Sequence, residues 1–478
     1  MHRLYSLAFG AVAAALTFTA SSASAASLTR QPYLQRVGPD TATIAFRLDG
    51  NCVPAVRYGP QGSTNQSAQS ADAGRNHAIV LSGLQPGTEY TYLVEACGAR
   101  TNPVRFSTAP VPGTRSVHFT AVGDFGMNNA DQRSVANAML AREPELFLML
   151  GDNAYESGTE AEFQNNLFVP MAPLLAQVPS VAVPGNHEYV TNRAQPYFDN
   201  LYLPTSSTGG EHYYSFDWGH VHFVGLDANC AMGMASQDRC SLASQRKWLE
   251  QDLAASDAPW KVVFLHYPPW SSGEHGSQPL IRREFTPLFE KYGVDLVLTG
   301  HDHHYERSQP MKGNAVGPSG ERNPTYLVVG GGGAALRPFA TSKPSWTVVR
   351  NDQDHGYLDV KVEEGTLSAQ VLTPSGKLVD SFTLTKDLPP APQEEPPVTA
   401  DPGSPPTAEQ PSPTPPVVTP TPGTVTGNPG LPGGPEDEED VDGLGPNAPA
   451  GCSTGPAMAL LPAGALVLAG ALRRRRRR

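Results

Sequence analysis

Short apolar runs that end in polar turns recur along the middle of the chain and predict buried strands. Five runs have this form: VHFTAV before GDFG, LFLML before GDNAY, SVAV before PGNHE, KVVFL before HYPPW, and DLVLT before GHDHHYER. The intervening segments ADQRSVANAMLARE and SQRKWLEQDLAA repeat apolar residues at helical spacing. Strands therefore alternate with helices, which predicts an α/β domain over residues 116–387.

A different pattern precedes this domain. Between residues 27 and 112, short runs such as TATIAFRL and EYTYLVEA alternate and are separated by Gly, Pro and Asn, as in a small antiparallel β-sandwich. The stretch LSGLQPGTEYTYLV, with Leu84, Pro86 and Tyr90, resembles the tyrosine-corner strand of fibronectin type III domains. This segment holds no cluster of histidines, cysteines or acids, so we expect no chemistry there.

Both ends of the chain indicate targeting rather than a folded core. Residues 1–25 combine Arg3, an apolar stretch and small residues, the pattern of a cleaved secretory signal peptide. Residues 388–451 are rich in Pro, Thr, Gly and acids, which predicts an extended, disordered linker. Residues 452–478 place a cysteine before a short apolar run and six arginines, an order that resembles the myxobacterial-type C-terminal sorting tag. A transmembrane stop-transfer segment is the alternative. We expect a secreted or cell-surface protein that meets the cell envelope through this tag.

Charge and cysteine content narrow the class of protein further. The formal net charge is −12, and nothing outside the tail indicates a nucleic-acid surface. If the substrate is an anion, we therefore expect something other than arginine to attract it. Five cysteines in an exported chain predict disulfides. We pair Cys52 with Cys97 and Cys230 with Cys240 because each pair is local, which leaves Cys452 as a processing or lipidation handle.

The polar turns of the α/β domain hold the residues that carry chemistry. They supply carboxylates, an amide and imidazoles, but no cysteine: Asp124, Asp152, Asn186, His187, His266, His301 and His303. Ligands of open α/β sheets bind beyond the carboxyl ends of the strands, so five such turns should converge on one site. Hard oxygen donors mixed with imidazoles suit two first-row metals at a hydrolytic centre rather than a structural zinc.

The order GD, GD, GNH, H and GHxH resembles that of the calcineurin-like metallophosphoesterases and spans most of the α/β domain. Most of that superfamily carries D-x-H in the first turn, whereas this chain has Asp124-Phe125-Gly126. The pairing of GDFG with GDNAY resembles the purple acid phosphatases, whose tyrosine binds iron(III) as tyrosinate. The resemblance implies an αββα four-layer sandwich, and it implies that Tyr155 supplies the missing ligand. Packing of Tyr155 under a loop is the alternative.

The same resemblance implies a two-metal centre with a shared carboxylate. Iron(III) is expected on Asp124, Asp152, Tyr155 and His303. A second, divalent metal (zinc, iron or manganese) is expected on Asp152, Asn186, His266 and His301. Phenolate suits a trivalent ion, and such an ion acidifies bound water strongly, so the metal-bound hydroxide nucleophile should persist in acid.

Two further histidines are assigned to catalysis by the resemblance. His187 is expected to hydrogen-bond the phosphoryl group, and His275 in SSGEHGSQ to act as a catalytic histidine that protonates the leaving group. Plant members often carry a second histidine where this chain has Gly276, so a plant-like substrate preference is not implied. A solvated loop histidine is the alternative for His275. Three other histidines are assigned packing or supporting roles: His220, His222 and His304.

The sequence thus predicts an exported dimetal acid phosphatase that hydrolyses small phosphate monoesters. Because the same metals can attack diesters, a phosphodiesterase or nucleotidase is the alternative within the enzyme class. A non-catalytic cell-surface binding module, with the metal fold as scaffold, is the alternative from another class. Residues 116–387 contain no G-x-S-x-G motif of the kind that many serine hydrolases carry.

Overall fold

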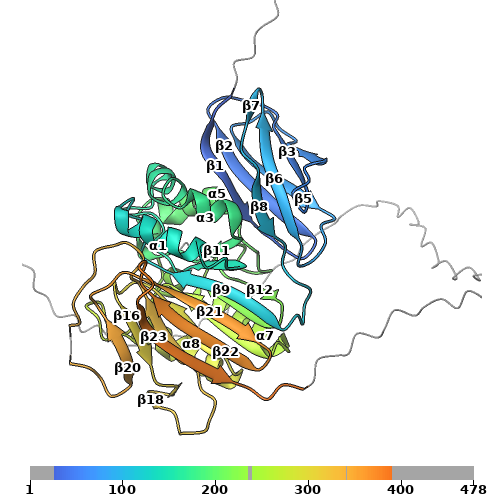
Figure 1. The fold of residues 1–478 in the computed structure, drawn as a ribbon. Coiled ribbons are helices and arrows are strands. Elements are labelled where there is room, and N and C mark those ends of the chain that lie inside the picture. Colours follow the sequence, from blue (N-terminus) through green and yellow to red (C-terminus); the bar gives the residue numbers. More distant parts are fainter. Residues whose placement is uncertain (1–25, 235–239, 341, 390–478) are drawn as a thin grey trace, which may run out of the picture. The chain divides into compact units, whose positions relative to one another are not determined.

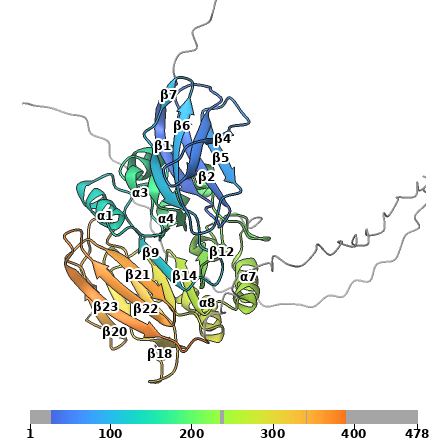
Figure 2. The same cartoon turned by 45° about the vertical axis from the view of Figure 1, so that its right-hand side comes forward.

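The computed structural model describes residues 26–234, 240–340 and 342–389. The α/β part of the chain is built on two mixed β-sheets with helices packed beside them, and a separate set of strands precedes it (Figure 1; Figure 2 gives a second view). The predicted signal peptide, nearly all of the predicted linker and the predicted sorting tag lie outside the described residues. Among the helices that are described, none is both long and apolar enough to cross a membrane.

The first central sheet has six strands, and its parallel strands end at the predicted site. In spatial order they are β11 (Ser180–Ala182), β10 (Leu146–Met149), β9 (Ser116–Val122), β21 (Tyr357–Glu363), β22 (Thr366–Leu372) and β23 (Leu378–Thr385). Strands β9, β10 and β11 are parallel, whereas β21 joins β9 antiparallel and continues into β22 and β23 as hairpins. Each of the four residues of β10 is buried, as expected of a strand covered on both faces.

The second central sheet has seven strands. In spatial order they are β12 (Tyr214–Trp218), β13 (Val221–Leu226), β14 (Trp260–Leu265), β15 (Leu296–Thr299), β19 (Thr325–Val329), β16 (Tyr305–Ser308) and β20 (Thr347–Asn351). Strands β13, β14, β15 and β19 are parallel, and the strands on both sides of them are antiparallel. The parallel strands point their carboxyl ends in one direction, which gathers the turns that follow them.

The two sheets pack face to face and carry helices on their other sides. Phe119 of β9 meets Phe223 of β13 edge-on, with ring centroids 5.2 Å apart. The main helices are α1 (Ala130–Leu140), α3 (Ala172–Gln177), α7 (Leu242–Ala255) and α8 (Pro279–Lys291). Helix α1 packs on β21 and α3, and α7 packs on α8, so one buried core joins Met139 of α1 with Leu249 of α7. The layers run helix, sheet, sheet, helix, as the sequence predicts.

Local sequence explains where these helices begin. The side chain of Asn129 accepts a hydrogen bond from the Gln132 amide (2.9 Å) at the start of α1, and Ser241 caps α7 in the same way. Helix α8 starts at Pro279, whose missing N–H costs nothing in a first turn. The shorter elements are α2 (Glu160–Glu162), a π-helix (Phe163–Phe168), α4 (Asn186–Tyr189), a 3-10 helix (Asn192–Ala194), α5 (Gln195–Asn200), α6 (Ala228–Ala231), β17 (Met311–Lys312) and β18 (Ala315–Val316).

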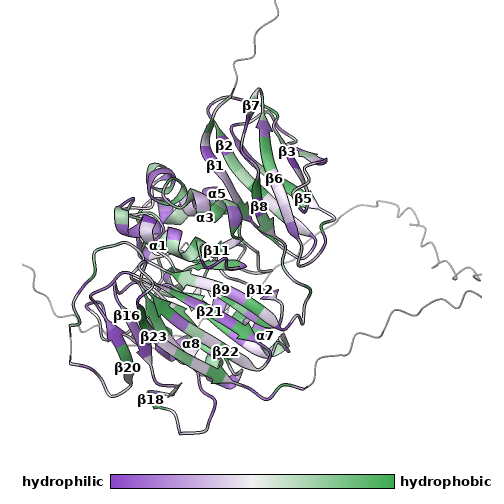
Figure 3. Cartoon of the chain, viewed as in Figure 1, coloured by the Kyte–Doolittle hydropathy of each residue, from purple (hydrophilic) through white to green (hydrophobic). Residues whose placement is uncertain are grey.

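The N-terminal strands form the predicted antiparallel sandwich. One sheet contains β1 (Leu28–Gln35), β2 (Thr41–Leu48) and β5 (Asn76–Ser82); the other contains β4 (Gln66–Gln69), β3 (Ala55–Pro60), β6 (Glu89–Ala96) and β7 (Ala99–Arg100), with β8 (Val104–Ser107) paired to β6. Exposed and buried residues alternate along β5, and the strands of the sandwich carry both hydrophobic and hydrophilic residues (Figure 3). The Tyr90 hydroxyl accepts a hydrogen bond from the Gln85 amide (2.9 Å), the contact that defines a tyrosine corner. Kinship with fibronectin type III domains stays a prediction.

Strand β1 ties this sandwich to the α/β part of the chain. The Tyr33 hydroxyl donates to the Asn200 carbonyl (2.6 Å), and Arg30 contacts both the Asn200 side chain (2.5 Å) and Glu160 (3.1 Å). The Tyr92 hydroxyl of β6 donates to the carbonyl of Ala176 in α3 (2.9 Å). Both predicted disulfides, Cys52–Cys97 and Cys230–Cys240, are present.

Candidate metal centre

The predicted site residues follow parallel strands of both sheets, either in loops or at the start of the short helix α4. The six-stranded sheet contributes Asp124 after β9, Asp152 and Tyr155 after β10, and Asn186 and His187 after β11. The seven-stranded sheet contributes His266 after β14, and His301 and His303 after β15. Because the sheets pack face to face with these strand ends together, residues up to about 180 positions apart in the sequence become neighbours.

Three of these side chains meet around the Tyr155 hydroxyl. The hydroxyl oxygen lies 3.1 Å from Oδ1 of Asp124 and 3.1 Å from Nε2 of His303. Nε2 of His303 is 3.6 Å from the same Asp124 oxygen. This is the set that the sequence assigns to iron(III), together with Asp152, which also interacts with the Tyr155 hydroxyl.

A second group gathers around the Asn186 side-chain oxygen. That oxygen lies 3.1 Å from Nε2 of His266 and 3.0 Å from Nδ1 of His301. Nε2 of His266 is 3.3 Å from Oδ2 of Asp152, and the ligand atoms of Asp152, His266 and His301 all lie within 4.8 Å of one another. Asp152 therefore touches both groups, which is where a bridging carboxylate belongs.

The orientation of the histidine rings fits metal binding. Nδ1 of His303 donates to the Ala335 carbonyl and Nδ1 of His266 donates to the Leu150 carbonyl, each at 2.9 Å. A carbonyl can only accept, so these bonds place a ring proton on Nδ1 and direct Nε2 toward the carboxylates, where its lone pair can bind a metal once Nε2 carries no proton. Metal-binding histidines commonly have this outer partner. Two buried carboxylates, a phenol and an amide oxygen complete a hard donor set, so the residues present fit two metal ions.

The electrostatics of the protein groups at the site show which of them lack a counter-charge within the protein. Burial raises the pKa of Asp124 well above its usual value, with the nearby Asp152 adding to the effect. Burial alone would also raise the pKa of Asp152, but His266 outweighs it and holds that pKa below its usual value. Burial would lower the pKa of His266, yet Asp152 raises it to about 9, so His266 acts as the counter-ion of Asp152.

The other donors are held in their neutral forms. Burial, followed by the charges of Asp124 and Asp152, raises the pKa of Tyr155 well above its usual value, so a phenolate here requires a nearby cation. Burial and the neighbouring His266 lower the pKa of His301 well below its usual value. Burial and the guanidinium of Arg337 lower the pKa of His303 to about 4. Neutral imidazoles are the form that binds metals.

Three of the predicted ligands have strained backbone conformations. Asp124 (φ 60°), Asp152 (φ 52°) and His301 (φ 73°) all adopt the left-handed conformation that non-glycine residues rarely take. Each such residue costs on the order of 1–3 kcal/mol, and the surrounding fold must supply that energy. Strain of this kind is typical of sites in which side-chain direction matters more than local stability.

Gly126 explains why the first turn carries no histidine. A Cβ atom at this position would overlap the backbone carbonyl of Asn153, so no side chain fits. The Gly126 carbonyl instead accepts a hydrogen bond from the Tyr155 amide (2.9 Å). The close approach of the two turns thus excludes a ligand at 126 and carries Tyr155 into the site.

The two predicted catalytic histidines contact different donor groups of the site. The His187 ring packs on Tyr155 with centroids 4.4 Å apart, and its Nδ1 donates to the Glu156 carbonyl (2.6 Å). The His275 ring stacks on His301 with centroids 4.4 Å apart and an interplanar angle of 27°. His187 is partly exposed and His275 is exposed, so both are accessible to a substrate at this site.

Sequence reasoning missed three residues of the site. Buried Glu188 accepts backbone N–H bonds from the ligand turns, and buried Asp302 accepts them from the loop that carries His275. Both stand inside motifs that the sequence displays, GNHE and GHDH, but their roles depend on which backbone groups they face. Arg337 contacts Nε2 of His275 and has no motif around it that could have indicated this.

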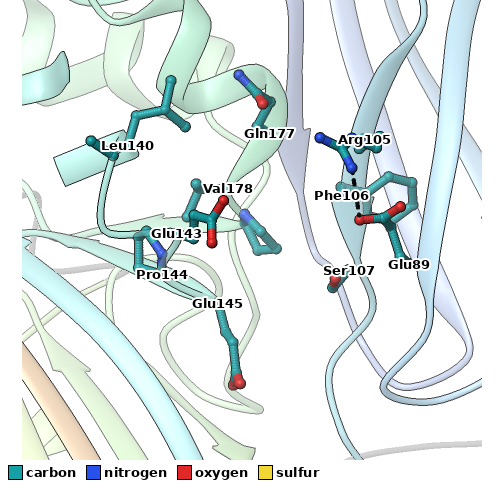
Figure 4. A pocket seen from close by; sticks show the side chains of 12 residues that line it. Glu89, Arg105, Phe106, Ser107, Leu140, Glu143, Pro144, Glu145, Gln177 and Val178 are labelled. Carbon is teal, nitrogen blue, oxygen red and sulfur yellow. Dashed lines mark ion pairs between the residues drawn. The ribbon is translucent and has the colours of Figure 1, made fainter. Parts of the chain in front are cut away.

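Two other features of the described residues, a second cluster of possible metal ligands and a cavity, lie apart from the candidate metal centre. His212, Asp227 and Cys240 lie close enough to hold an ion, but Cys240 is consumed in a disulfide. A cavity of about 430 Å³ opens beside β8, α1 and α3, where Arg105 and Glu89 form an ion pair at 3.6 Å (Figure 4). None of the residues that line this cavity belongs to the metal centre.

Comparison with known proteins assigns this fold and site to a class. Residues 117–305 match the family model of the calcineurin-like phosphoesterases, and residues 323–381 match that of the iron/zinc purple acid phosphatase-like protein C region. The chain is thus a calcineurin-like phosphoesterase. Together the two matches cover slightly more than half of the chain. Within the calcineurin-like phosphoesterases, the chain belongs to the purple acid phosphatase-like members. It is thus a hydrolase of the acid phosphatase type.

Individual relatives agree with this assignment. The chain is 29% identical over 340 residues to purple acid phosphatase 23 of Arabidopsis thaliana (62% of this chain, 70% of the relative) and 26% identical over 351 residues to acid phosphatase type 7 of Mus musculus (65% and 74%). It is also 27% identical over 370 residues to probable inactive purple acid phosphatase 1 of Arabidopsis thaliana and spans only 58% of that relative. The purple acid phosphatase PPD1 of yellow lupin (Lupinus luteus) shares the fold, with a TM-score of 0.65 and 21% identity over 74% of each chain.

Proposed function

We propose that this protein hydrolyses small phosphate monoesters in acid solution at a two-metal centre. The observation that carries the proposal is the convergence of seven donors in two groups that share Asp152. Iron(III) would be held by Asp124, Asp152, Tyr155 and His303, and a divalent ion by Asp152, Asn186, His266 and His301. When bound, the two ions would neutralise phosphate charge and acidify water at the site.

The side chains of this protein supply the rest of the proposed reaction. His187, fixed by the Glu156 carbonyl, presents Nε2 to the phosphoryl group. His275, which stacks on His301, is proposed to face the leaving group and to protonate it as the ester bond breaks. The protein family includes a relative named as probably inactive, but this chain keeps every one of the seven donors, which favours catalysis over a purely binding role.

Export of the protein is proposed as well. The two disulfides agree with an oxidising compartment, since such bonds rarely persist in the cytosol. N-terminal sequencing of the mature protein tests for cleavage after residue 25. Mass spectrometry of the same material tests whether residues 473–478 are removed, and an intact arginine run would favour a membrane anchor instead of a sorting tag.

Colour and substrate range test the proposed chemistry together. Purified wild-type protein loaded with iron is expected to absorb visible light through tyrosinate-to-iron charge transfer and to hydrolyse nitrophenyl phosphate faster than bis(nitrophenyl) phosphate. Tyr155→Phe removes the phenol oxygen but not the ring, so it should lose the visible band while its melting temperature stays close to that of wild type. A colourless, fully iron-loaded wild type would contradict the ligand assignment, and faster cleavage of the diester would favour a phosphodiesterase.

A further inference from the structure

Arg337 holds a fixed position beside the metal centre. Its backbone amide donates to the carbonyl of the predicted ligand His303 (3.1 Å), and its guanidinium contacts Nε2 of His275. The only carboxylate paired with it among the described residues is Glu274, at 3.7 Å, and that side chain is 59% exposed. Arg337 is itself 32% exposed, so part of its guanidinium faces solvent at the site.

Arg337 lies beside His275, one of the two predicted catalytic histidines. His275 stacks on His301, and Arg337 contacts Nε2 of His275, so the three side chains form one chain of contacts. His187 packs on Tyr155 instead. If His275 faces the leaving group of the substrate, as proposed above, then Arg337, which contacts His275, lies beside that leaving group.

We propose that Arg337 is a specificity-determining residue that binds an anionic group carried by the leaving group of the substrate. The favoured substrates are then monoesters whose alcohol or phenol bears a carboxylate or a further phosphate. A guanidinium has five N–H donors in a planar fork that matches such oxyanions, and the exposed Glu274 at 3.7 Å leaves most of them available. The inference rests on the proposed function, and it revises the expectation that no arginine attracts the substrate.

A matched pair of substrates tests the inference. Phenyl phosphate and 3-carboxyphenyl phosphate differ by one carboxylate, whereas their phenols are similarly poor leaving groups. The wild-type, metal-loaded protein should prefer the carboxylated ester. Arg337→Ala should lower the ratio of kcat/KM for the carboxylated ester to kcat/KM for phenyl phosphate by roughly tenfold, mainly through KM, because a partly exposed charge-assisted bond is lost. Arg337→Lys, which keeps the charge but not the fork, should fall between.

The control is Arg57→Ala in the N-terminal sandwich. Arg57 is 41% exposed and pairs with Glu95 at 3.8 Å, so its exposure and its ion pair resemble those of Arg337, and the ratio should not change. Equal slowing of both esters in Arg337→Ala would overturn the inference, because Arg337 would then only support His275 or His303. If the wild type hydrolyses neither ester, the proposed function fails. In that case, calorimetry measures the affinities of the metal-loaded wild type and of Arg337→Ala for the two esters. The ratio of these affinities then replaces the ratio of kcat/KM.

Discussion

The turns of the six-stranded sheet and those of the seven-stranded sheet bring different atoms to one site. The first sheet contributes the oxygen donors: Asp124, Asp152, Tyr155 and Asn186. The second contributes the nitrogen donors: His266, His301 and His303. Neither sheet alone holds a complete set for either proposed ion, so the centre exists only because the two sheets pack face to face.

A buried carboxylate supports the loops of each sheet at the site: Glu188 for the six-stranded sheet and Asp302 for the seven-stranded sheet. The two carboxylates accept hydrogen bonds from different kinds of loop. Glu188 accepts backbone N–H bonds from Asp152 (3.0 Å), Asn153 (2.8 Å), Ala154 (3.0 Å) and Gly185 (2.6 Å), which are the ligand turns themselves. It therefore fixes the geometry of the oxygen donors.

Asp302 faces a different loop. It accepts N–H bonds from His275 (2.9 Å) and Gly276 (3.2 Å) and the hydroxyl of Ser271, while Glu306 accepts the amide of Ser272 (2.7 Å). Asp302 is thus a positioning residue for His275, although two predicted metal ligands flank it in the sequence. The difference suggests that metal retention and turnover can be altered separately, one from each half.

The largest expected effect comes from Glu188→Gln. The amide replaces an oxygen acceptor with an N–H₂ group that faces backbone donors, so the ligand turns lose their support. Metal affinity should fall roughly 10- to 100-fold, the range found when groups that orient metal ligands are removed. Titration with metal followed by elemental analysis measures this, and exposed Glu363→Gln serves as the control. Unchanged metal affinity with reduced turnover would contradict the assigned role.

Asp302→Asn should separate turnover from metal binding in the other half. One of the two oxygens that hold the His275 loop becomes an amide nitrogen, so the histidine loses its fixed position. A positioned acid supplies roughly 10²–10⁴ in rate, and we expect kcat for alkyl phosphates to fall about tenfold. Nitrophenyl phosphate should be affected less, because its leaving group departs without a proton, and metal content should not change. Metal loss in parallel with kcat would show that Asp302 supports the ligands His301 and His303 instead.

The smallest effect on activity is expected far from the predicted metal centre, where a histidine in each sheet pairs with carboxylates in a different way. In the six-stranded sheet, Asp359 of β21 binds His118 (2.7 Å) and also Arg142 (2.8 Å), a permanent cation. In the seven-stranded sheet, His222 alone lies between Asp217 (2.6 Å) and Asp252 (3.0 Å). Burial lowers the pKa of His222, but the two carboxylates outweigh it and raise that pKa to about 9.

This contrast predicts a pH-dependent stability. Because the pKa of His222 is higher in the folded chain than the ordinary value of 6.5, its contribution is complete below pH 6.5 and is lost as the pH rises to about 9. The free energy of unfolding should fall by on the order of 1–3 kcal/mol across that interval. Urea unfolding at several pH values should show this fall in wild type and a flatter profile in His222→Gln, with activity per folded molecule unchanged. Identical profiles in the two proteins would refute the role.

The sequence by itself determined the parts that depend on local patterns. Apolar runs and helical spacing determined the alternation of strands and helices, the sandwich and the two local disulfides, because these features follow from short-range periodicity and spacing. The motif order also indicated which side chains would converge, since the carboxyl ends of parallel strands meet at one edge. The metal-binding and catalytic roles of these side chains remain predictions.

Only the tertiary structure decided which distant segments lie side by side. Strand β21 joins β9 although more than 230 residues separate them, and no local pattern specifies such a pairing. In the same way, a buried carboxylate such as Glu188 and a rim cation such as Arg337 acquire their roles from the backbone and side chains that surround them in space. The physical reason is that burial and electrostatic interaction depend on distance through the folded molecule, not along the chain.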